Sequence, residues 1–388
     1  MDLGSQLVAT SPLGQAARSI VPLLDEHAEY ADREGRLHED VVEAFHREGL
    51  FQMWVPEVVG GSELDPLHSL ETLEIASYGD PSAGWVLMAS CLAIGTAGSY
   101  LADDAVAELW ADGRRPVIAG QGTRPGTAVP HEDGFLVSGS WSFASGLLHG
   151  THIHTLAVIT TTNEPRIFVV PVEKASLLGN WDVLGLRGTG SIDYTLDSVY
   201  VPDSYSHFAV VDEPLRGGAL YRVGIIGIAT MCHSGWALGV GRRLLDELGA
   251  LVHDGAGRAG SRAASDAFQQ DYAKAEARLR AARALVFEAW GDAWDTLCAG
   301  ARMSVRQHTL VRLALTNATN ALAEVADFVY LAGGTTALRR GTIQRLVRDV
   351  HAGTQHVTSA PAVWANCGRE LAGLAEGKHW QFLDLVDP

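Results

Sequence analysis

Leu184-Gly-Leu-Arg-Gly-Thr-Gly190 and, just after it, Tyr194-Thr-Leu-Asp-Ser-Val-Tyr-Val-Pro202 are the two stretches that decide the fold. The first is rich in glycine, which is typical of a turn. The second is rich in β-branched and aromatic residues and ends at a proline, which is typical of a strand. The sequence therefore predicts a turn that leads into a β-strand near the middle of the chain.

Four similar short runs precede this stretch, which itself forms a fifth, and each is bounded by Gly, Pro, Asn or Asp. Their spacing predicts an antiparallel β unit of about 90 residues. The runs are Val117–Gly122, Gly134–Ser142, His152–Thr160, Arg166–Pro171 and Ile192–Val201.

The sequence on both sides of the β unit has the apolar period of helices. Helices are expected over Pro12–Glu48, Leu64–Tyr78 and Ala83–Leu101, and again near 222–254, 264–298, 302–332 and 341–375. Four long helices in succession suggest a bundle. We therefore predict a mainly α protein with a central β-domain: an N-terminal helical domain (1–115), a middle antiparallel β-barrel or sandwich (116–213) and a C-terminal four-helix bundle (214–388).

The composition excludes several classes of protein. Of 388 residues 47% are hydrophobic, which excludes a disordered chain. The net charge of −17 argues against a partner made of nucleic acid, because no basic surface is available to neutralise phosphates. The four cysteines are scattered without a CxxC pair, so neither a disulfide framework nor a zinc site is expected.

Two apolar stretches, the N-terminus and a cluster of histidines bear on where the protein works and what it binds. Ser82–Leu101 and Val223–Gly241 are uncharged and long enough to span a membrane, but their Gly, Ala and Ser content favours buried helices. No basic region precedes an apolar one at the N-terminus, so we expect no export signal and a cytoplasmic protein without a membrane partner. His149, His152 and His154 lie close together, but no cysteine or carboxylate completes the set, so we expect no metal.

The run Ser140-Trp-Ser-Phe-Ala-Ser-Gly146 combines a strand pattern with hydroxyl groups. Alternation along a strand would place Trp141, Phe143 and Ser145 on one face. Such a face offers a flat apolar wall and one hydrogen-bonding group, which suits an isoalloxazine ring. An ordinary strand followed by a serine turn explains the same pattern, and from this run alone both interpretations stay open.

Four motifs in order resemble the acyl-CoA dehydrogenase superfamily. The Gly-Leu-Arg-Gly-Thr turn and the strand ending Val-Tyr-Val-Pro202 are similar to the signature of its middle β-domain. The other three matching motifs are Pro56-Glu-Val-Val-Gly-Gly61, Ala332-Gly-Gly-Thr-Thr336 and Arg345-Leu-Val-Arg-Asp349. The resemblance covers essentially the whole chain and implies that superfamily's fold.

The residues after Asp349 narrow the chemistry. A dehydrogenase of this superfamily needs a carboxylate base, but Asp349-Val-His-Ala-Gly-Thr-Gln-His356 and the following residues up to Pro361 contain no acid after Asp349, and the helix around Tyr221–Gly241 has none. The histidines and the Trp-Ser-Phe-Ala-Ser-Gly run instead resemble the oxygenase components of two-component, group-D flavin-dependent monooxygenases. In that branch a separate NAD(P)H:flavin reductase supplies FMNH2, which reacts with O2 at its C4a atom to form the hydroperoxide that transfers oxygen.

The resemblance implies hydroxylation of a small, aromatic or polyketide- or indole-like metabolite, with FMN as the cofactor and FAD as the other candidate. Three alternatives remain: N-oxygenation of an amine or amino sugar, an acyl-CoA dehydrogenase using FAD with another base, and a flavin-binding protein without catalysis. Purified protein that holds yellow FAD tightly would favour a dehydrogenase.

The resemblance also assigns candidate residues. Ser145 corresponds to the family's flavin-contacting serine and His356 to its late active-site histidine, with His351 taking that role if the helix is offset. Arg258, or Arg262 in its place, corresponds to an arginine that reaches the flavin phosphate of a neighbouring subunit, which implies a homotetramer. The remaining cofactor candidates are Trp141, Ser142, Phe143, Gly146, Gly333, Gly334, Thr335 and Thr336.

The substrate side is assigned from the uncharged helices. Many members of that branch carry a histidine in the helix after Gly-Trp-Val, but Gly84-Trp-Val-Leu-Met-Ala-Ser-Cys-Leu-Ala93 has none. His233 lies on an apolar helix and is either a core histidine or a pocket residue. The candidates for the substrate pocket are Met88, Cys91, Met231, His233 and Trp236.

Overall fold

The computed structural model describes residues 7–211, 213–255 and 262–387 of the chain. Its first part is helical, as predicted. Ser11 accepts a hydrogen bond from the Gly14 amide at the start of the first helix, and Gly35 ends that helix with φ 70°, which glycine adopts without a Cβ clash. The helices of this part are α1 (Pro12–Glu34), α2 (Glu39–Arg47), α3 (Pro66–Gly79), α4 (Pro81–Tyr100) and α5 (Asp103–Leu109).

Helix α4 is buried almost all round. It and the segment Ala219–Asp254 are long and apolar enough to cross a membrane, but 89% and 72% of their most apolar windows are buried inside the protein. Burial of this kind is that of core helices, as predicted from their Gly, Ala and Ser content.

Seven strands form one sheet with the order β5-β6-β2-β1-β3-β4-β7. Neighbouring strands are antiparallel except β1 and β3, which are parallel, so the expected fully antiparallel sheet is wrong at this pair. The chain leaves β2 through a short 3-10 helix, η4 (Leu147–His149), and returns on the far side of β1. The strands are β1 (Ile118–His131), β2 (Gly134–Trp141), β3 (His152–Ile159), β4 (Pro165–Pro171), β5 (Ser176–Leu177), β6 (Tyr194–Pro202) and β7 (Ser206–Phe208).

The C-terminal part is a helical bundle closed by a small hairpin. The fourth predicted helix, 341–375, is not continuous: it breaks between α10 (Thr342–Gly353) and α11 (Pro361–Leu371) at the 3-10 helix η10 (Val357–Ser359). Ala360 is extended (φ −62°, ψ 151°) because it precedes Pro361, which disfavours helical backbone in the residue before it. The elements are α6 (Gly224–Asp254), α7 (Asp266–Cys298), α8 (Val305–Gly333), α9 (Thr335–Leu338), α10 (Thr342–Gly353), α11 (Pro361–Leu371), β8 (His379–Gln381) and β9 (Asp384–Val386).

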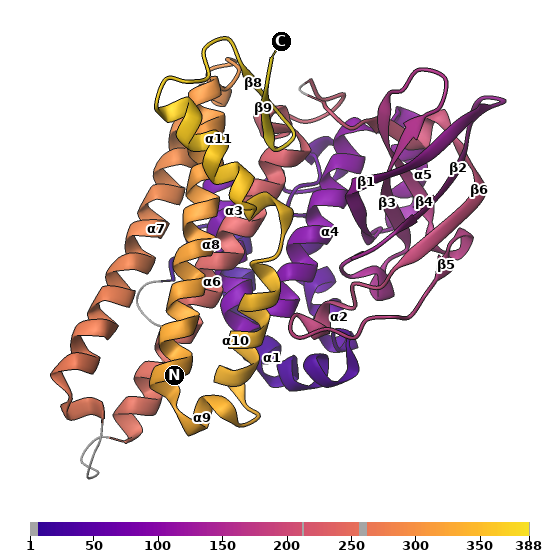
Figure 1. Cartoon of the computed structure of the whole chain (residues 1–388). Coiled ribbons are helices and arrows are strands. Elements are labelled where there is room, and N and C mark those ends of the chain that lie inside the picture. Colours follow the sequence, from indigo (N-terminus) through magenta and orange to yellow (C-terminus); the bar gives the residue numbers. More distant parts are fainter. Residues whose placement is uncertain (1–6, 212, 256–261, 388) are drawn as a thin grey trace.

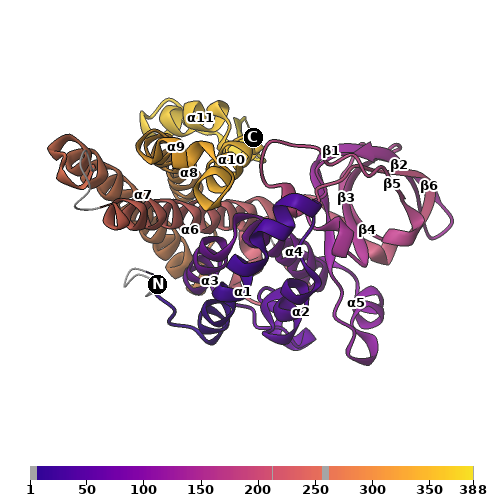
Figure 2. The same cartoon turned by 90° about the horizontal axis from the view of Figure 1, so that it is seen from below.

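The N-terminal helices lie between the bundle and the sheet (Figures 1 and 2). Helix α3 packs on α6, and α4 contacts both α6 and β1. The N-terminal and C-terminal helices therefore share one apolar core, whereas the sheet has a separate core of its own. The predicted fold, mainly α with a central β unit, is confirmed. Helix α4 is the element that brings sheet and bundle together.

Candidate active site

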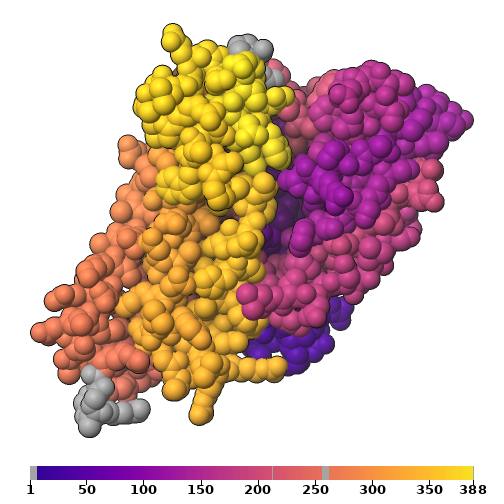
Figure 3. Space-filling view, viewed as in Figure 1, coloured from indigo at the N-terminus to yellow at the C-terminus, as the bar shows by residue number. Residues whose placement is uncertain are grey.

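The surface is hollowed between the yellow-orange C-terminal helices and the magenta β region (Figure 3). Side chains from α4 and three other elements meet at this junction. The indole of Trp85 on α4 touches a serine from the loop after β2, a histidine from α6 and a histidine from the start of η10. These three residues are Ser145, His233 and His356.

Ser145 belongs to a chain of hydrogen bonds whose direction is fixed at both ends. At one end the Trp85 Nε1–H can only donate, and it donates to Ser145 Oγ at 3.1 Å. At the other end Thr189 Oγ1 donates to the carbonyl oxygen of Leu186 at 2.7 Å, because a carbonyl can only accept. Ser191 Oγ lies between them, 2.8 Å from Ser145 Oγ and 2.7 Å from Thr189 Oγ1.

The single hydroxyl proton of each residue determines the rest. The Thr189 proton is already used on Leu186, so Ser191 donates to Thr189. Ser145 in turn donates to Ser191. Ser145 Oγ thus has its proton and one lone pair engaged, and one lone pair remains to accept a hydrogen bond from a ligand.

The backbone around Ser145 explains why the serine is placed here. Phe143 has φ 67°, so the extended strand ends and the chain turns. The Gly146 amide then donates to the carbonyl oxygen of Thr189 at 2.9 Å, which ties the serine loop to the Gly-Leu-Arg-Gly-Thr turn. The turn that decides the fold therefore also positions the serine.

His233 and His356 face each other with ring centroids 3.9 Å apart and planes tilted by 33°. Burial lowers the pKa of His356 to about 4 and that of His233 well below its usual range, the nearby His356 adding to the second shift. No carboxylate among the described residues acts against either shift. Both imidazoles are therefore neutral at physiological pH, although they lie close together.

The two histidines offer different hydrogen-bonding groups. The Thr358 backbone N–H donates to His356 Nδ1 at 3.4 Å, and the Thr358 hydroxyl lies 2.8 Å from the same atom. Since Nδ1 accepts, the neutral His356 ring carries its proton on Nε2. Within the described chain neither nitrogen of His233 takes part in a hydrogen bond of this kind. The pair can therefore offer both a donor and an acceptor to a ligand.

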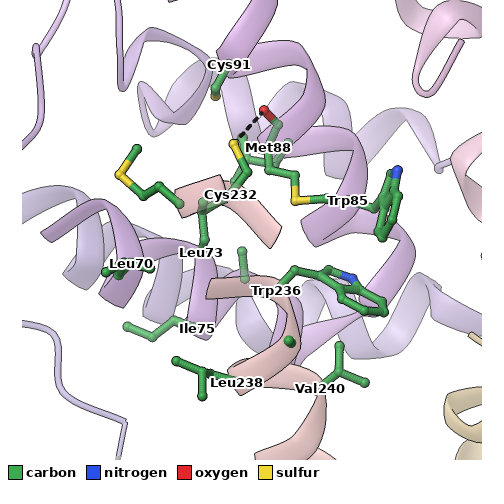
Figure 4. Packing of buried hydrophobic residues seen from close by; sticks show 14 of the residues in the cluster. Leu70, Leu73, Ile75, Trp85, Met88, Cys91, Cys232, Trp236, Leu238 and Val240 are labelled. Carbon is green, nitrogen blue, oxygen red and sulfur yellow. Dashed lines mark hydrogen bonds between the residues drawn. The ribbon is translucent and has the colours of Figure 1, made fainter. Parts of the chain in front are cut away.

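The wall around the histidines is apolar. Trp85 and Trp236 meet edge to face with ring centroids 5.0 Å apart, and Met88 lies beside Trp85 (Figure 4). Trp236 is held by a hydrogen bond from its Nε1 to the carbonyl oxygen of Pro81. Of the residues expected to line the substrate pocket, His233 lies here and Trp236 beside it. Met88, Cys91 and Met231 are at most 1% exposed and pack in the core.

The predicted aromatic wall is wrong at Trp141. This residue is fully buried inside the sheet, where it stacks on Tyr194 at 5.3 Å and donates a hydrogen bond to the carbonyl oxygen of Leu156. Phe143 is 67% exposed and contacts Trp181 edge to face. Alternation fails because β2 ends at Trp141 and Phe143 has left-handed backbone, so Trp141, Phe143 and Ser145 do not share a face. Ser142 follows the strand end in the same loop.

His351 lies away from this site. Its Nε2 is 3.3 Å from Asp327 Oδ1 on α8, and its side chain is 42% exposed. In the alternative alignment the role of His356 would fall to a partly exposed histidine that contacts Asp327.

The phosphate-loop candidates gather at one end of the bundle. Gly333 and Gly334 end α8, and Thr335 and Thr336 begin α9, which packs on α8 and α10. A Cβ at Gly334 would come within 3.0 Å of the Arg262 guanidinium, so Arg262 lies against this turn. Arg258 falls outside the described residues.

The Arg-Asp motif contacts the turn that decides the fold. Asp349 Oδ1 accepts a hydrogen bond from the Leu186 amide at 2.6 Å, and Arg348 donates to the Leu184 carbonyl oxygen. Burial and the nearby Asp80 raise the pKa of Asp349 to about 7. Asp349 is thus committed to holding the turn and is not placed to serve as a substrate base.

Three functional candidates could not be recognised from the sequence: Trp85, Thr189 and Ser191. Thr189 and Ser191 lie within or next to the quoted turn, but nothing in their spacing shows that their hydroxyl groups reach Ser145. Trp85 belongs to the Gly-Trp-Val run, whose only unusual feature in the sequence is that no histidine follows it. His27, His38 and Asp40 form a group whose possible metal-ligand atoms lie within 4.8 Å of one another, but His38 Nδ1 accepts a hydrogen bond from the Asp40 amide as the cap of α2.

Both helical parts of the chain match domains of a known family. Residues 15–110 match the acyl-CoA dehydrogenase N-terminal domain and residues 231–361 the C-terminal domain of that family. Indole-3-acetate monooxygenase from Pseudomonas putida is 32% identical, over 88% of this chain and 89% of that protein. The flavin-dependent monooxygenase oxygenase subunit HsaA from Rhodococcus jostii is 26% identical, over 89% of this chain and 94% of that subunit.

The same fold is found among solved structures. The crystal structure of 3-HSA hydroxylase from Rhodococcus sp. RHA1 superposes with a TM-score of 0.88 at 23% identity, covering 94% of this chain and 97% of that one. Four sequence motifs, the match to both family domains and the monooxygenase relatives lead to one assignment. This chain belongs to the acyl-CoA dehydrogenase superfamily, in its branch of flavin-dependent monooxygenases.

Proposed function

We propose that the protein is an oxygenase component that hydroxylates a neutral, indole-like or phenolic small molecule, with its flavin bound beside Ser145 and its substrate beside His233 and His356. The observation that carries this proposal is the position of Trp85, which donates a hydrogen bond to Ser145 and contacts both histidines. The Trp85 indole therefore contacts both the Ser145 hydroxyl group, which could bind a flavin edge, and the two histidines, beside which an aromatic ring could bind.

The residues around Ser145 fit a flavin. Ser145 Oγ keeps one free lone pair for the ring edge, and the exposed Phe143 provides apolar surface close by in the same loop. When bound, the reduced flavin supplies the activated oxygen. Ser145 binds the flavin edge by a hydrogen bond, and Trp85 keeps the serine oriented.

The substrate side is where the chain's own acid and base chemistry takes place. His356 offers a proton at Nε2, and His233 offers a lone pair to an N–H or O–H group of the substrate. Positioned imidazoles of this kind contribute roughly 10²- to 10⁴-fold to proton-transfer steps. Trp85 and Trp236 exclude water and provide aromatic surface for the ring that is oxidised.

The absence of compensating charge favours a neutral ring over an amine. A cationic amine would need a carboxylate, and none among the described residues offsets the low pKa of either histidine. Indole-3-acetate, named for the Pseudomonas putida relative, shares the indole ring that this pocket suits.

Assembly and location follow from the same proposal. The Arg262–Gly334 contact forms a basic turn at the end of the bundle, which suits the phosphate of a flavin bound by another subunit of a homotetramer. A separate reductase would deliver FMNH2, and the enzyme would work in the cytoplasm, with FADH2 as the other candidate cofactor.

One experiment tests the function. The protein is mixed anaerobically with photoreduced FMN and indole, and ¹⁸O2 is then admitted. We expect indole that has gained one ¹⁸O atom, detected by mass spectrometry, and less H2O2 than without indole. Quantitative release of H2O2 with indole and with a panel of phenols would contradict the proposal. Reduction of tightly bound FAD by an acyl-CoA would favour the dehydrogenase alternative.

A further inference from the structure

The hydrogen-bond chain through Ser145 ends on a carbonyl group, which can only accept. This fixes the direction of every hydrogen bond in the chain, and we call the resulting direction at Ser145, where the hydroxyl can only accept from a ligand, its polarity. Thr189 is only 2% exposed, as is Ser191, so water does not compete for these hydroxyl groups. The Leu186 carbonyl oxygen fixes the Thr189 proton, Thr189 fixes that of Ser191, and Ser191 fixes that of Ser145. Each step follows from the rule that a hydroxyl group has one proton to donate.

This polarity has a consequence for the two redox states of a flavin. Reduced flavin carries a hydrogen on N5 and can donate there, whereas oxidised flavin has only a lone pair at N5. A serine that can only accept a hydrogen bond matches the N5–H group of reduced flavin. With oxidised flavin, the lone pair of the serine would face the lone pair of N5. An acceptor left unsatisfied in a buried site is costly, whereas a matched pair stabilises the complex.

We propose that Ser191 and Thr189 are positioning residues that hold the Ser145 hydroxyl as a hydrogen-bond acceptor, so that the protein selects reduced over oxidised flavin. This inference rests on the proposed function only in placing the flavin edge at Ser145. Ser191 and Thr189, which lie in or next to the turn that decides the fold, would thus help to select the redox state of the cofactor. Such selection would help an oxygenase that receives reduced flavin from another protein, because oxidised flavin would dissociate after each turnover and leave the site free for reduced flavin.

The carbonyl end of the chain is itself firmly held. The Leu186 amide donates to the buried Asp349, and Leu186 has left-handed backbone with φ 54°. The Leu186 carbonyl therefore cannot turn away without breaking the contact between the turn and α10. The polarity of Ser145 is set by the packing of the turn against the bundle.

The test measures binding without turnover. Dissociation constants of oxidised and reduced FMN, and of oxidised and reduced FAD, are determined for the full-length protein by anaerobic ultrafiltration. We expect the wild-type protein to bind the reduced form of its flavin at least fivefold more tightly, the ratio that corresponds to about one hydrogen bond. In Ser191→Ala the Ser145 proton is free to turn toward the ligand, and the ratio should fall severalfold, mainly because the oxidised form binds better.

Three variants separate polarity from general damage. Thr189→Val removes the fixed end of the chain and should lower the ratio, whereas Thr189→Ser keeps a hydroxyl group there and should restore it. Ser90→Ala removes a buried hydroxyl group on α4 that has no hydrogen-bond partner in the described chain and should leave the ratio unchanged. Thermal unfolding of each variant establishes that it is folded.

The outcomes distinguish the inference from the proposed function. Equal binding of both redox states by the wild-type protein, or an unchanged ratio in both Ser191→Ala and Thr189→Val, overturns the inference even if indole is hydroxylated. A ratio that collapses in these variants supports the inference even if no aromatic compound tested is hydroxylated. Binding of neither FMN nor FAD in either state overturns both.

Discussion

Trp85 donates a hydrogen bond from its indole nitrogen to Ser145 Oγ at 3.1 Å, across 60 residues of sequence. The same ring lies 4.8 Å from His233 and 5.7 Å from His356, centroid to centroid. The residue that orients the serine is therefore also in contact with both histidines. Ser145 and the two histidines contact different parts of this ring, so we expect mutations on the flavin side and on the substrate side to have different kinetic effects.

Ser145→Ala should uncouple oxygen use from hydroxylation. Removing the hydroxyl group deletes one hydrogen bond to the flavin edge, about 1 kcal/mol or more in a buried site. Oxygen consumption should persist, while hydroxylated product falls and H2O2 rises correspondingly. The ratio of product to H2O2 checks this, with Ser90→Ala as the matched control. A Ser145→Ala protein that stays fully coupled would show that the serine does not contact the flavin.

His356→Ala should slow oxygen transfer to the substrate by roughly 10²-fold or more, because it removes the imidazole that is positioned beside the substrate. His351→Ala should have a much smaller effect, because His351 pairs with Asp327 at the surface. Single-turnover product formation with reduced FMN and indole measures both. The reverse order of effects would move the catalytic assignment to His351 and would mean that the sequence match at this helix is offset.

Arg262→Ala should weaken FMN binding roughly 10- to 100-fold, as expected for a lost hydrogen bond from a charged group to a phosphate. Riboflavin, which has no phosphate, should bind the variant and the wild-type protein equally. Arg306→Ala, which removes an arginine paired with Glu370, is the control. Light scattering should show an oligomer. A monomer with normal FMN affinity would exclude a flavin site shared between subunits.

His154 and His207 should make the protein less stable in acid. Burial lowers their pKa to about 3 and about 4, so both stay neutral in the folded protein while they gain protons in the unfolded chain below pH about 6.5. More protons are bound in the unfolded state, so the free energy of unfolding falls as pH drops from about 6.5 toward 4. His207→Gln should be less stable at pH 7 but lose less stability on going to pH 5. Urea unfolding at both values measures the difference, and an identical loss in both proteins would contradict it.

Asp349→Asn should act in the opposite sense. The pKa of Asp349 is raised to about 7, so the folded protein binds a proton that the unfolded chain has released above pH about 4. The contribution of this group to stability is therefore present at low pH and is lost as pH rises toward and above 7. Asparagine keeps the acceptor for the Leu186 amide without the charge. We expect Asp349→Asn to gain stability relative to the wild-type protein at pH 8, on the order of 1 kcal/mol, and to gain less or nothing at pH 5. Equal shifts at both values would contradict this.

The sequence alone determined the elements and the family. The strand at Tyr194–Pro202 and the apolar period of α6, α7 and α8 are local patterns, set by side-chain alternation and helical spacing, and they agree with the structure to within a few residues. The missing carboxylate after Asp349 already argued against a dehydrogenase. The motif around Ser145 pointed to a flavin, and the relatives are flavin-dependent monooxygenases.

Only the tertiary structure decided which side chains meet. Strand alternation placed Trp141 beside Ser145, but a left-handed Phe143 ended the strand and Trp141 packed inside the sheet. The sequence favoured a core position for His233, but α6 places its ring 3.9 Å from that of His356. The polarity of Ser145 depends on hydrogen bonds that reach from α4 to the Leu186 carbonyl, and each has a direction only because its neighbour's proton is already used. Sequence periodicity fixes local backbone and burial, whereas hydrogen-bond direction is a property of groups brought together from distant parts of the chain.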